Sequence, residues 1–177
     1  PEVAGLELRF SPIFRQSLFE NYLRPFDAIY EFGCGSGINL SQLAQLFPQK
    51  SLMGLDWAQP AVDLVNLIAA KHKFRLSSRR FDFFSPDETL QFMPNSAILT
   101  MCALEQIGDN HEAFVDFLLQ RKPALCVHME PLEELYDLQS LVDYVGLRYH
   151  TQRGYLSGFV TKLKQLATEG VIEIVRL

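Results

Sequence analysis

The chain has 177 residues, of which 48% are apolar and 21% are charged, and its formal net charge is −5. These proportions are typical of a folded domain with one sizeable core and argue against disorder. A mildly acidic chain lacks the clustered Lys and Arg that neutralise phosphates, so we expect no nucleic-acid partner. No apolar run approaches the roughly 18 residues that span a bilayer, and no signal peptide is visible. We therefore expect no membrane partner and a cytoplasmic location.

The three cysteines are Cys34, Cys102 and Cys126. Their odd number and their spacing match no zinc site. Each stands in an apolar or glycine-rich stretch, which favours buried free thiols in a reducing compartment. We expect no metal ion.

Short apolar runs alternate with helical periodicity along the chain. The predicted strands cover 26–32, 51–55, 74–81, 96–103, 124–129 and 171–177. The predicted helices cover 12–23, 38–47, 60–72, 111–120, 132–146 and 155–169. Pro25 is expected to end the first helix, and Pro60 fits the first turn of the third.

Helical crossovers of this length imply parallel strands and a sheet covered on both faces. With right-handed crossovers the fold class is α/β, a doubly wound, mainly parallel Rossmann-like sheet. We expect one domain over 1–177, with an N-terminal helical cap over 1–25 and a C-terminal segment with an edge strand over 147–177. Such sheets bind ligands beyond the carboxyl ends of their strands.

A glycine-rich loop follows the first predicted strand and reads Glu31-Phe-Gly33-Cys34-Gly35-Ser-Gly37. Glycines let the backbone turn tightly and approach a ligand, and the next helix begins with free N–H groups. A dinucleotide fingerprint would read G-x-G-x-x-G. Here the third glycine comes one position early, and an acid stands two residues before the first.

The second and third predicted strands are followed by carboxylates. Asp56, with Trp57 beside it, stands where several nucleoside-binding folds place an acid that bonds both ribose hydroxyls. Asp82 follows the third strand and precedes Phe83. Phenylalanines are more often core residues than ligand contacts, so that alternative stays open for Phe83.

Together these motifs resemble class I S-adenosylmethionine-dependent methyltransferases of the small-molecule type, over roughly residues 12–135. The resemblance implies S-adenosyl-L-methionine as cofactor, with the glycine loop against its methionine part. It also implies that Asp56 binds the ribose, that Trp57 lies against the adenine, and that Asp82 and Phe83 receive the adenine amino group and ring. The cofactor-binding residues expected are Glu31, Gly33, Cys34, Gly35, Gly37, Asp56, Trp57, Asp82, Phe83, Cys102 and Ala103.

The ends of the fourth and fifth predicted strands carry the candidate catalytic residues. Ala103-Leu-Glu105-Gln106 is similar to a run that many small-molecule members of the family place beside the methyl group and the acceptor. The Asn/Asp-Pro-Pro-aromatic run of nucleic-acid adenine and protein glutamine methyltransferases is absent from the sequence. A His beside a carboxylate can act as an oriented general base. We expect Glu105 and His128 to be catalytic, and structural roles for both remain open.

Four residues are candidates for contact with the methyl acceptor: Gln106, Glu130, Arg153 and Tyr155. Arg153 can hold a carboxylate or phosphate, and Tyr155 can cover a pocket. The alternative for Arg153 and Tyr155 is a surface loop before the next helix.

The sequence thus predicts an enzyme that moves a methyl group by direct displacement to an O or N atom of a small molecule, as a monomer or homodimer. Two alternatives stay open. One is a non-catalytic S-adenosylmethionine-binding or interaction module, and the other is an NAD-dependent oxidoreductase, against which the early third glycine counts. The family's sheet usually ends in two further strands, and only 171–177 is evident. The sheet is therefore expected to lack its last strand or to be completed by a neighbouring chain.

Overall fold

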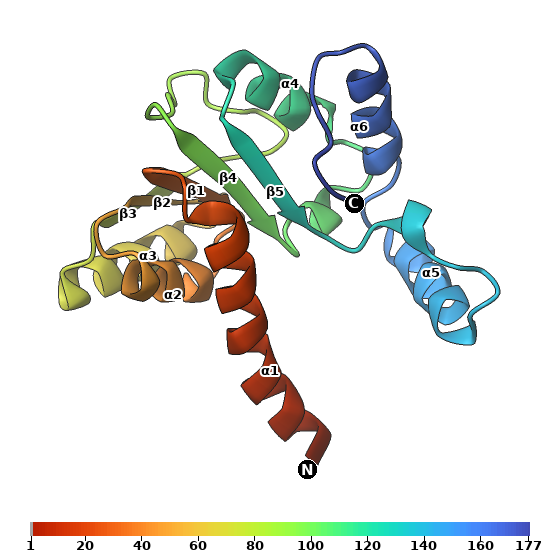
Figure 1. Ribbon diagram of the computed structural model, residues 1–177, viewed down its shortest axis with the longest axis horizontal. Helices are drawn as coiled ribbons and strands as arrows, with labels where there is room; N and C mark the ends of the chain where they lie inside the picture. Colours follow the sequence, from red (N-terminus) through yellow and green to blue (C-terminus); the bar gives the residue numbers. More distant parts are fainter. Residues whose placement is uncertain (1) are drawn as a thin grey trace.

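Five parallel strands form one sheet in the computed structural model, which describes the backbone of residues 2–177 and the side chains of residues 9–177 (Figure 1). The strands are β1 (Ala28–Phe32), β2 (Ser51–Asp56), β3 (Leu76–Arg80), β4 (Ser96–Met101) and β5 (Leu125–Met129). Their order is β3-β2-β1-β4-β5, and every neighbouring pair is parallel. The predicted α/β, doubly wound sheet is confirmed. The order reverses between β1 and β4, so the switch point lies at their carboxyl ends.

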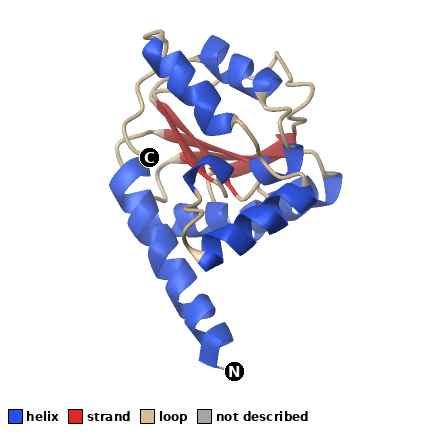
Figure 2. Ribbon diagram, turned by 90° about the vertical axis from the view of Figure 1, so that its right-hand side faces the viewer, coloured by secondary structure: helices blue, strands red, loops and turns tan. Residues whose placement is uncertain are grey.

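Helices cover both faces of this sheet (Figure 2). They are α1 (Glu2–Leu18), α2 (Ile38–Leu46), α3 (Gln59–His72), α4 (Glu112–Arg121), α5 (Leu141–Arg153) and α6 (Phe159–Thr168). Shorter turns are η1 (Phe19–Leu23), η2 (Leu104–Ile107) and η3 (Glu133–Leu135). In the part of the chain that the structure describes, no helix combines the length and apolar character needed to cross a membrane.

The central strand β1 is buried along its whole length and divides the core in two. Successive side chains of a strand point to opposite faces. Ile29 therefore joins η1, α2 and α3 in one apolar cluster, whereas Phe32 joins α4 and α6 in the other. Full burial of one such side chain contributes roughly 1.5–3 kcal/mol. The same alternation turns Glu31 toward the α2 face, beneath the glycine loop.

The N-terminal helix begins earlier than the sequence predicts. Helix α1 starts at Glu2 rather than at residue 12, and Pro12 lies inside it. An interior proline removes one hydrogen bond and crowds the carbonyl four residues earlier, at a cost of about 3 kcal/mol or more, so other contacts must stabilise this part of α1. Gln42 of α2 holds this region, because it accepts a hydrogen bond from Arg15 Nε at 3.0 Å and donates one to the Pro12 carbonyl at 2.8 Å. Pro1 lies outside the described residues.

The predicted helices after β5 are displaced along the chain. A helix was expected over 132–146, but α5 begins after Ser140, whose hydroxyl accepts the Asp143 N–H, and ends before Gly154. A helix was expected over 155–169, but α6 begins only after Gly158. Both boundary glycines have positive φ, a conformation that glycine adopts without strain. Figure 1 shows α5 to one side of the sheet.

The strand predicted over 171–177 is wrong, because this segment pairs with no strand in the described residues. The Val171 N–H bonds to the Leu166 carbonyl and closes the end of α6. Beyond it, Ile172 packs against the core, and Arg176 donates to the Tyr22 hydroxyl at 2.9 Å. The segment has no regular secondary structure and is held by side-chain contacts. Strand β5 remains an edge strand.

Candidate functional site

The loops that follow β1 and β4 meet at the switch point of the sheet. The Gly33 N–H donates to the Leu55 carbonyl at 2.7 Å, which carries the β1–β2 pairing into the glycine loop. A Cβ atom on Gly33 would lie 2.3 Å from the Cβ of Ala103, and the φ of Gly33 is +71°. No side chain fits at this distance, so the first glycine is required by close packing as well as by its backbone conformation.

Asp56 at the end of β2 holds the glycine loop in place. Its Oδ2 accepts the Gly35 N–H at 2.8 Å, and its Oδ1 accepts the Ala58 N–H at 2.9 Å. Each carboxylate oxygen has two lone pairs, so Asp56 keeps acceptor capacity for a ligand hydroxyl. Gly35 has a φ of +49°, and a Cβ there would meet no atom within 4 Å. The backbone of Gly35 therefore borders open space that a ligand can enter.

Glu31, two residues before the first glycine, is only 1% exposed. Asn39 in the first turn of α2 donates to its Oε1 at 2.6 Å, while the buried Oε2 has no partner. Burial raises the pKa of Glu31 to about 8, so this carboxyl holds a proton at neutral pH. Sequence reasoning missed Asn39, although an amide directly after the glycine loop at the start of an apolar helix is a usable signal.

The residues expected around an adenine lie near the loop but in different environments. The Trp57 indole is 72% exposed. Asp82 is exposed, and its Oδ1 accepts the Phe84 N–H at 2.9 Å. The Phe83 ring packs edge-on against Phe114, with centroids 4.8 Å apart, and comes within 3.9 Å of the Cβ position of Gly33. Phe83 is thus both a half-buried core residue and a neighbour of the glycine loop.

The cysteines correct one expectation from the sequence. Cys34 is buried beneath the loop, and burial raises the pKa of its thiol to about 12. Cys126 is partly buried, but Cys102 is exposed. Strand β4 ends at Met101, and Cys102 follows with a φ of +52° and an N–H that donates to the Met129 carbonyl. This bend turns the Cys102 side chain outward.

His128 and Glu130 both lie beside Thr100. The buried Thr100 Oγ1 lies 2.9 Å from His128 Nδ1. The hydroxyl also lowers the pKa of the nearby Glu130 carboxyl. Glu130 Oε1 and Oε2 accept the Ala103 N–H at 3.2 and 3.0 Å, which fixes the loop after β4. Sequence reasoning missed Thr100, which reads as one more residue of a buried strand.

The surroundings of the His128 ring determine its charge. Although the residue as a whole is half-buried, its ring packs edge-on against Phe159 at 5.2 Å, and burial lowers its pKa to about 4. The imidazole is therefore neutral at pH 7. In the tautomer whose Nδ1–H donates to the Thr100 hydroxyl, Nε2 keeps a free lone pair. Burial also raises the pKa of the Glu130 carboxyl.

A groove of about 490 Å³ lies between the loop after β4 and the connection from α5 to α6. Gln106 and Tyr155 both line it. Glu105 is half-buried and accepts a hydrogen bond from Gln106 Nε2 at 3.0 Å. The exposed Arg153 lies over the rings of Tyr149 and Tyr155, at 5.7 and 5.9 Å from their centroids. Two of the four residues predicted to contact the acceptor, Gln106 and Tyr155, thus meet at one groove from distant segments, whereas Glu130 and Arg153 do not line it.

His111, the residue directly before α4, is buried behind the wall of the groove. It is 6% exposed, and its Nε2 lies 3.0 Å from the Ser157 carbonyl. Ser157 lines the groove, so His111 ties the start of α4 to the groove wall. A histidine in this position has a structural role.

Comparison with known proteins gives partial matches. No family model matches the chain. A trans-aconitate 2-methyltransferase from Deinococcus radiodurans is 33% identical over 78 residues, which cover 41% of this chain and 30% of that protein. The chain therefore corresponds to less than a third of that relative.

Solved structures match more of the chain. The plantazolicin methyltransferase BpumL in complex with SAH has a TM-score of 0.58 at 17% identity, covering 94% of this chain and 67% of that one. Coclaurine N-methyltransferase bound to N-methylheliamine and SAH has a TM-score of 0.53 at 13% identity, with coverages of 62% and 32%. The N-terminal domain of EvdMO1 with SAH bound has a TM-score of 0.51 at 19% identity, with coverages of 62% and 44%. At these identities the similarity establishes the fold, and the chain has the fold of class I S-adenosylmethionine-dependent methyltransferases.

Proposed function

We propose that this protein is an S-adenosylmethionine-dependent methyltransferase that transfers a methyl group to an O or N atom of a small molecule. The observation that carries the proposal is the glycine loop at the switch point, which the Gly35 N–H ties to Asp56. The partial match to a trans-aconitate 2-methyltransferase supports the same activity.

The residues at the loop fit this cofactor on two observations. The backbone of Gly35 borders open space, and one buried oxygen of Glu31 lacks a partner. We infer that Asp56 accepts the ribose hydroxyls, that the exposed Trp57 covers the adenine, and that the Glu31 carboxyl forms a hydrogen bond with the methionine part. When bound, S-adenosyl-L-methionine supplies an electrophilic methyl group on a sulfonium.

The chain's own residues then align the acceptor and take its proton. Displacement at a sulfonium leaves a neutral thioether, so no residue has to act as a general acid. Gln106 and Tyr155 line the groove that we assign to the acceptor, and orientation there supplies much of the rate. We infer that His128, neutral at pH 7, accepts a proton at Nε2, and that Glu105 orients or deprotonates the acceptor.

Titration calorimetry tests the cofactor. We expect S-adenosylmethionine and S-adenosylhomocysteine to bind and NAD to fail. Asp56→Asn should weaken cofactor binding about tenfold or more, since hydrogen bonds to charged groups contribute roughly 1.5–3 kcal/mol. Asp63→Asn, at an exposed position on α3, is the matched control and should bind as wild type. Tight NAD binding without S-adenosylmethionine binding would refute the proposal.

A screen of small O and N nucleophiles, read out as S-adenosylhomocysteine formed, tests catalysis. On a true acceptor, Glu105→Ala combined with His128→Ala should abolish most turnover. Full turnover by the double variant would exclude both from catalysis. Cofactor binding with no turnover on any acceptor would favour the non-catalytic module instead.

We further infer a cytoplasmic protein that works as a monomer or homodimer. Its three cysteines are all free, which suits a reducing compartment. Strand β5 is an open edge that a second copy can pair with. Sedimentation at several concentrations distinguishes the two states.

A further inference from the structure

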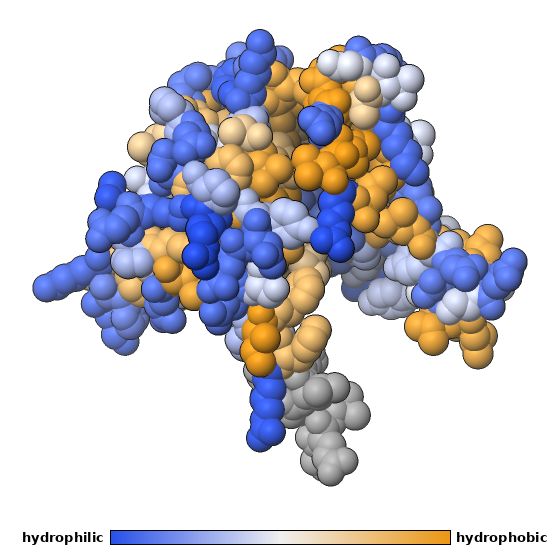
Figure 3. Space-filling model, viewed as in Figure 1, coloured by the Kyte–Doolittle hydropathy of each residue, from blue (hydrophilic) through white to orange (hydrophobic). Residues whose placement is uncertain are grey.

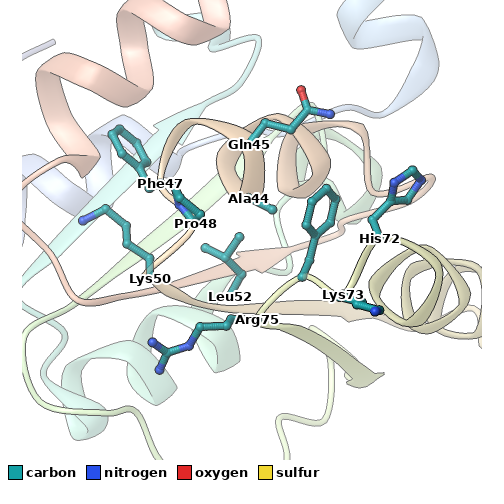
Figure 4. A pocket seen from close by; sticks show the side chains of 10 residues that line it. Ala44, Gln45, Phe47, Pro48, Lys50, Leu52, His72, Lys73 and Arg75 are labelled. Atoms are coloured by element: carbon teal, nitrogen blue, oxygen red, sulfur yellow. The ribbon is translucent and has the colours of Figure 1, made fainter.

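A second hollow lies at the end of the sheet opposite the glycine loop. The ends of α2 and α3 and the starts of β2 and β3 enclose about 310 Å³ (Figure 4). Because the strands are parallel, the start of β2 lies a full strand length from Asp56. The hollow is therefore separate from the proposed catalytic site.

The lining combines apolar groups with cationic groups. Ala44, Phe47, Leu52 and Phe74 supply apolar surface, and Lys50, Lys73 and Arg75 supply positive charge. Figure 4 shows Leu52 and Ala44 between Lys50 and Arg75 on one side and Lys73 on the other. The described residues that line the hollow include no carboxylate.

The cationic lining contrasts with the formal net charge of the whole chain, which is −5. Residues 45–80 carry six Lys or Arg side chains and two carboxylates, Asp56 and Asp63. Arg79 and Arg80 lie beside Leu55 and Asp56 at the carboxyl end of β2, which leaves four cationic residues toward the hollow: Lys50, Lys71, Lys73 and Arg75. Asp56 stands at the far end of β2, and Asp63 accepts a hydrogen bond from Gln59 on the exposed side of α3. Positive charge is thus concentrated where the hollow opens.

Several lining groups are held in place without a ligand. The Phe74 ring stacks on His72, with centroids 5.3 Å apart and planes inclined by 18°. Lys50 Nζ lies 5.0 Å from the Phe47 ring centroid and donates to the main-chain carbonyls of Arg24 and Phe26. Lys73 and Arg75 are exposed, so their charged groups are accessible to a partner in solution.

The helix dipole accounts for only part of this charge. Cations favour the last turn of a helix, and Lys71 and His72 occupy that turn in α3. Lys50 and Arg75 lie outside both helices. The Asp27 carboxylate favours the charged form of Lys50 but does not line the hollow. Asp27 Oδ2 accepts a hydrogen bond from Asn95 Nδ2 at 2.8 Å. A cationic rim around an apolar floor suits a ligand that is itself amphipathic.

We propose that this hollow binds an organic anion that carries an apolar ring or a short alkyl chain. Lys73 and Arg75 pair with the anionic group, and the apolar part contacts Phe47, Leu52 and Phe74. The volume of about 310 Å³ lies at the lower end of the range for small-molecule pockets, roughly 300–1,000 Å³. The site does not depend on the proposed methyltransferase activity.

Binding is measured by amide chemical shifts in NMR titrations, with phenyl phosphate and hexanoate as probes. We expect at least one of them to shift signals of residues 44–52 and 72–75. The Kd should rise about tenfold, or about 1.4 kcal/mol, in the double variant Lys73→Gln/Arg75→Gln. It should also rise with added salt, since exposed charges are screened. The matched control Lys162→Gln/Lys164→Gln, on α6, should bind as wild type.

Two further compounds separate the contributions of charge and apolar surface. Inorganic phosphate has the charge without the apolar part, and benzyl alcohol has the ring without the charge; both should bind more weakly than the two probes. The proposal is overturned if neither probe shifts these signals, or if the double variant retains the wild-type Kd. Inorganic phosphate binding as tightly as phenyl phosphate would also overturn it, because the apolar floor would then contribute nothing.

Discussion

The buried carboxyl of Glu31 should make the protein less stable as the pH rises. Its pKa is raised from 4.5 to about 8 by burial, so between these values the folded protein keeps a proton that the unfolded chain releases. Unfolding then releases protons, and the free energy of unfolding falls by up to about 1.4 kcal/mol per pH unit. This contribution to stability is complete below pH 4.5 and is lost as the pH rises through 8.

Glu31→Gln replaces the titrating group with a neutral amide of nearly the same shape. The amide carbonyl can accept the Asn39 N–H as Glu31 Oε1 does. Between pH 5 and pH 8 the free energy of unfolding of the wild type should fall by about 3 to 4 kcal/mol relative to this variant. Urea denaturation of both proteins at four pH values gives the difference, in which contributions common to both, including those of His128 and Glu130, cancel.

Glu173→Gln serves as the control, because Glu173 is exposed in the C-terminal segment. It should follow the wild-type pH dependence. Parallel curves for the wild type and Glu31→Gln would refute the reasoning, because Glu31 would then ionise equally in both states. The result would also remove Glu31 as a neutral group beneath the glycine loop.

Other changes test the site more locally. Gly33→Ala should lower the melting temperature more than Gly35→Ala. The reason is that overpacking against Ala103 costs about 1–3 kcal/mol, whereas Gly35 faces open space. Gly35→Ala should instead weaken cofactor binding, measured by calorimetry. NMR titration should show His128 neutral until the pH falls to about 4; since its folded pKa is depressed, its contribution to stability rises with pH from 4 to 6.5. Thr100→Val should change the ¹⁵N tautomer signature of His128, and an unchanged spectrum would argue against the hydrogen bond between Thr100 and His128.

The glycine loop and Asp56 could be predicted because their signals are local. A strand, a run of glycines and a helix specify one turn, and the next strand end must lie beside it in a parallel sheet. The structure places Gly35 and Asp56 in direct hydrogen bonding. The hydrogen bond between Glu31 and Asn39 forms across the same turn. It could not be predicted from the sequence, because the prediction needs the face of β1 on which Glu31 lies.

The segments after β5 were harder to predict because their apolar residues do not reveal a buried face. On α5, Leu141, Val142 and Val145 are more than half exposed, so periodicity gave wrong boundaries. Figure 3 shows hydrophobic surface on this helix. The alternating apolar residues of 171–177 read as a strand, yet strand formation needs a partner edge that the sequence does not display.

Three carboxyl groups near the strand ends, those of Glu31, Asp56 and Glu130, each hold a neighbouring segment of the chain in place. Glu31 accepts from Asn39 at the start of α2, Asp56 accepts from the Gly35 N–H, and Glu130 accepts from the Ala103 N–H. Each carboxyl sets the position of a backbone segment that borders the switch point, so a ligand there meets donors and acceptors that are already oriented. Burial raises the pKa of Glu31 to about 8, so this group adds no negative charge at neutral pH, and burial also raises the pKa of Glu130. A site built this way has acceptor atoms, such as those of Asp56, available for a ligand that brings hydrogen-bond donors.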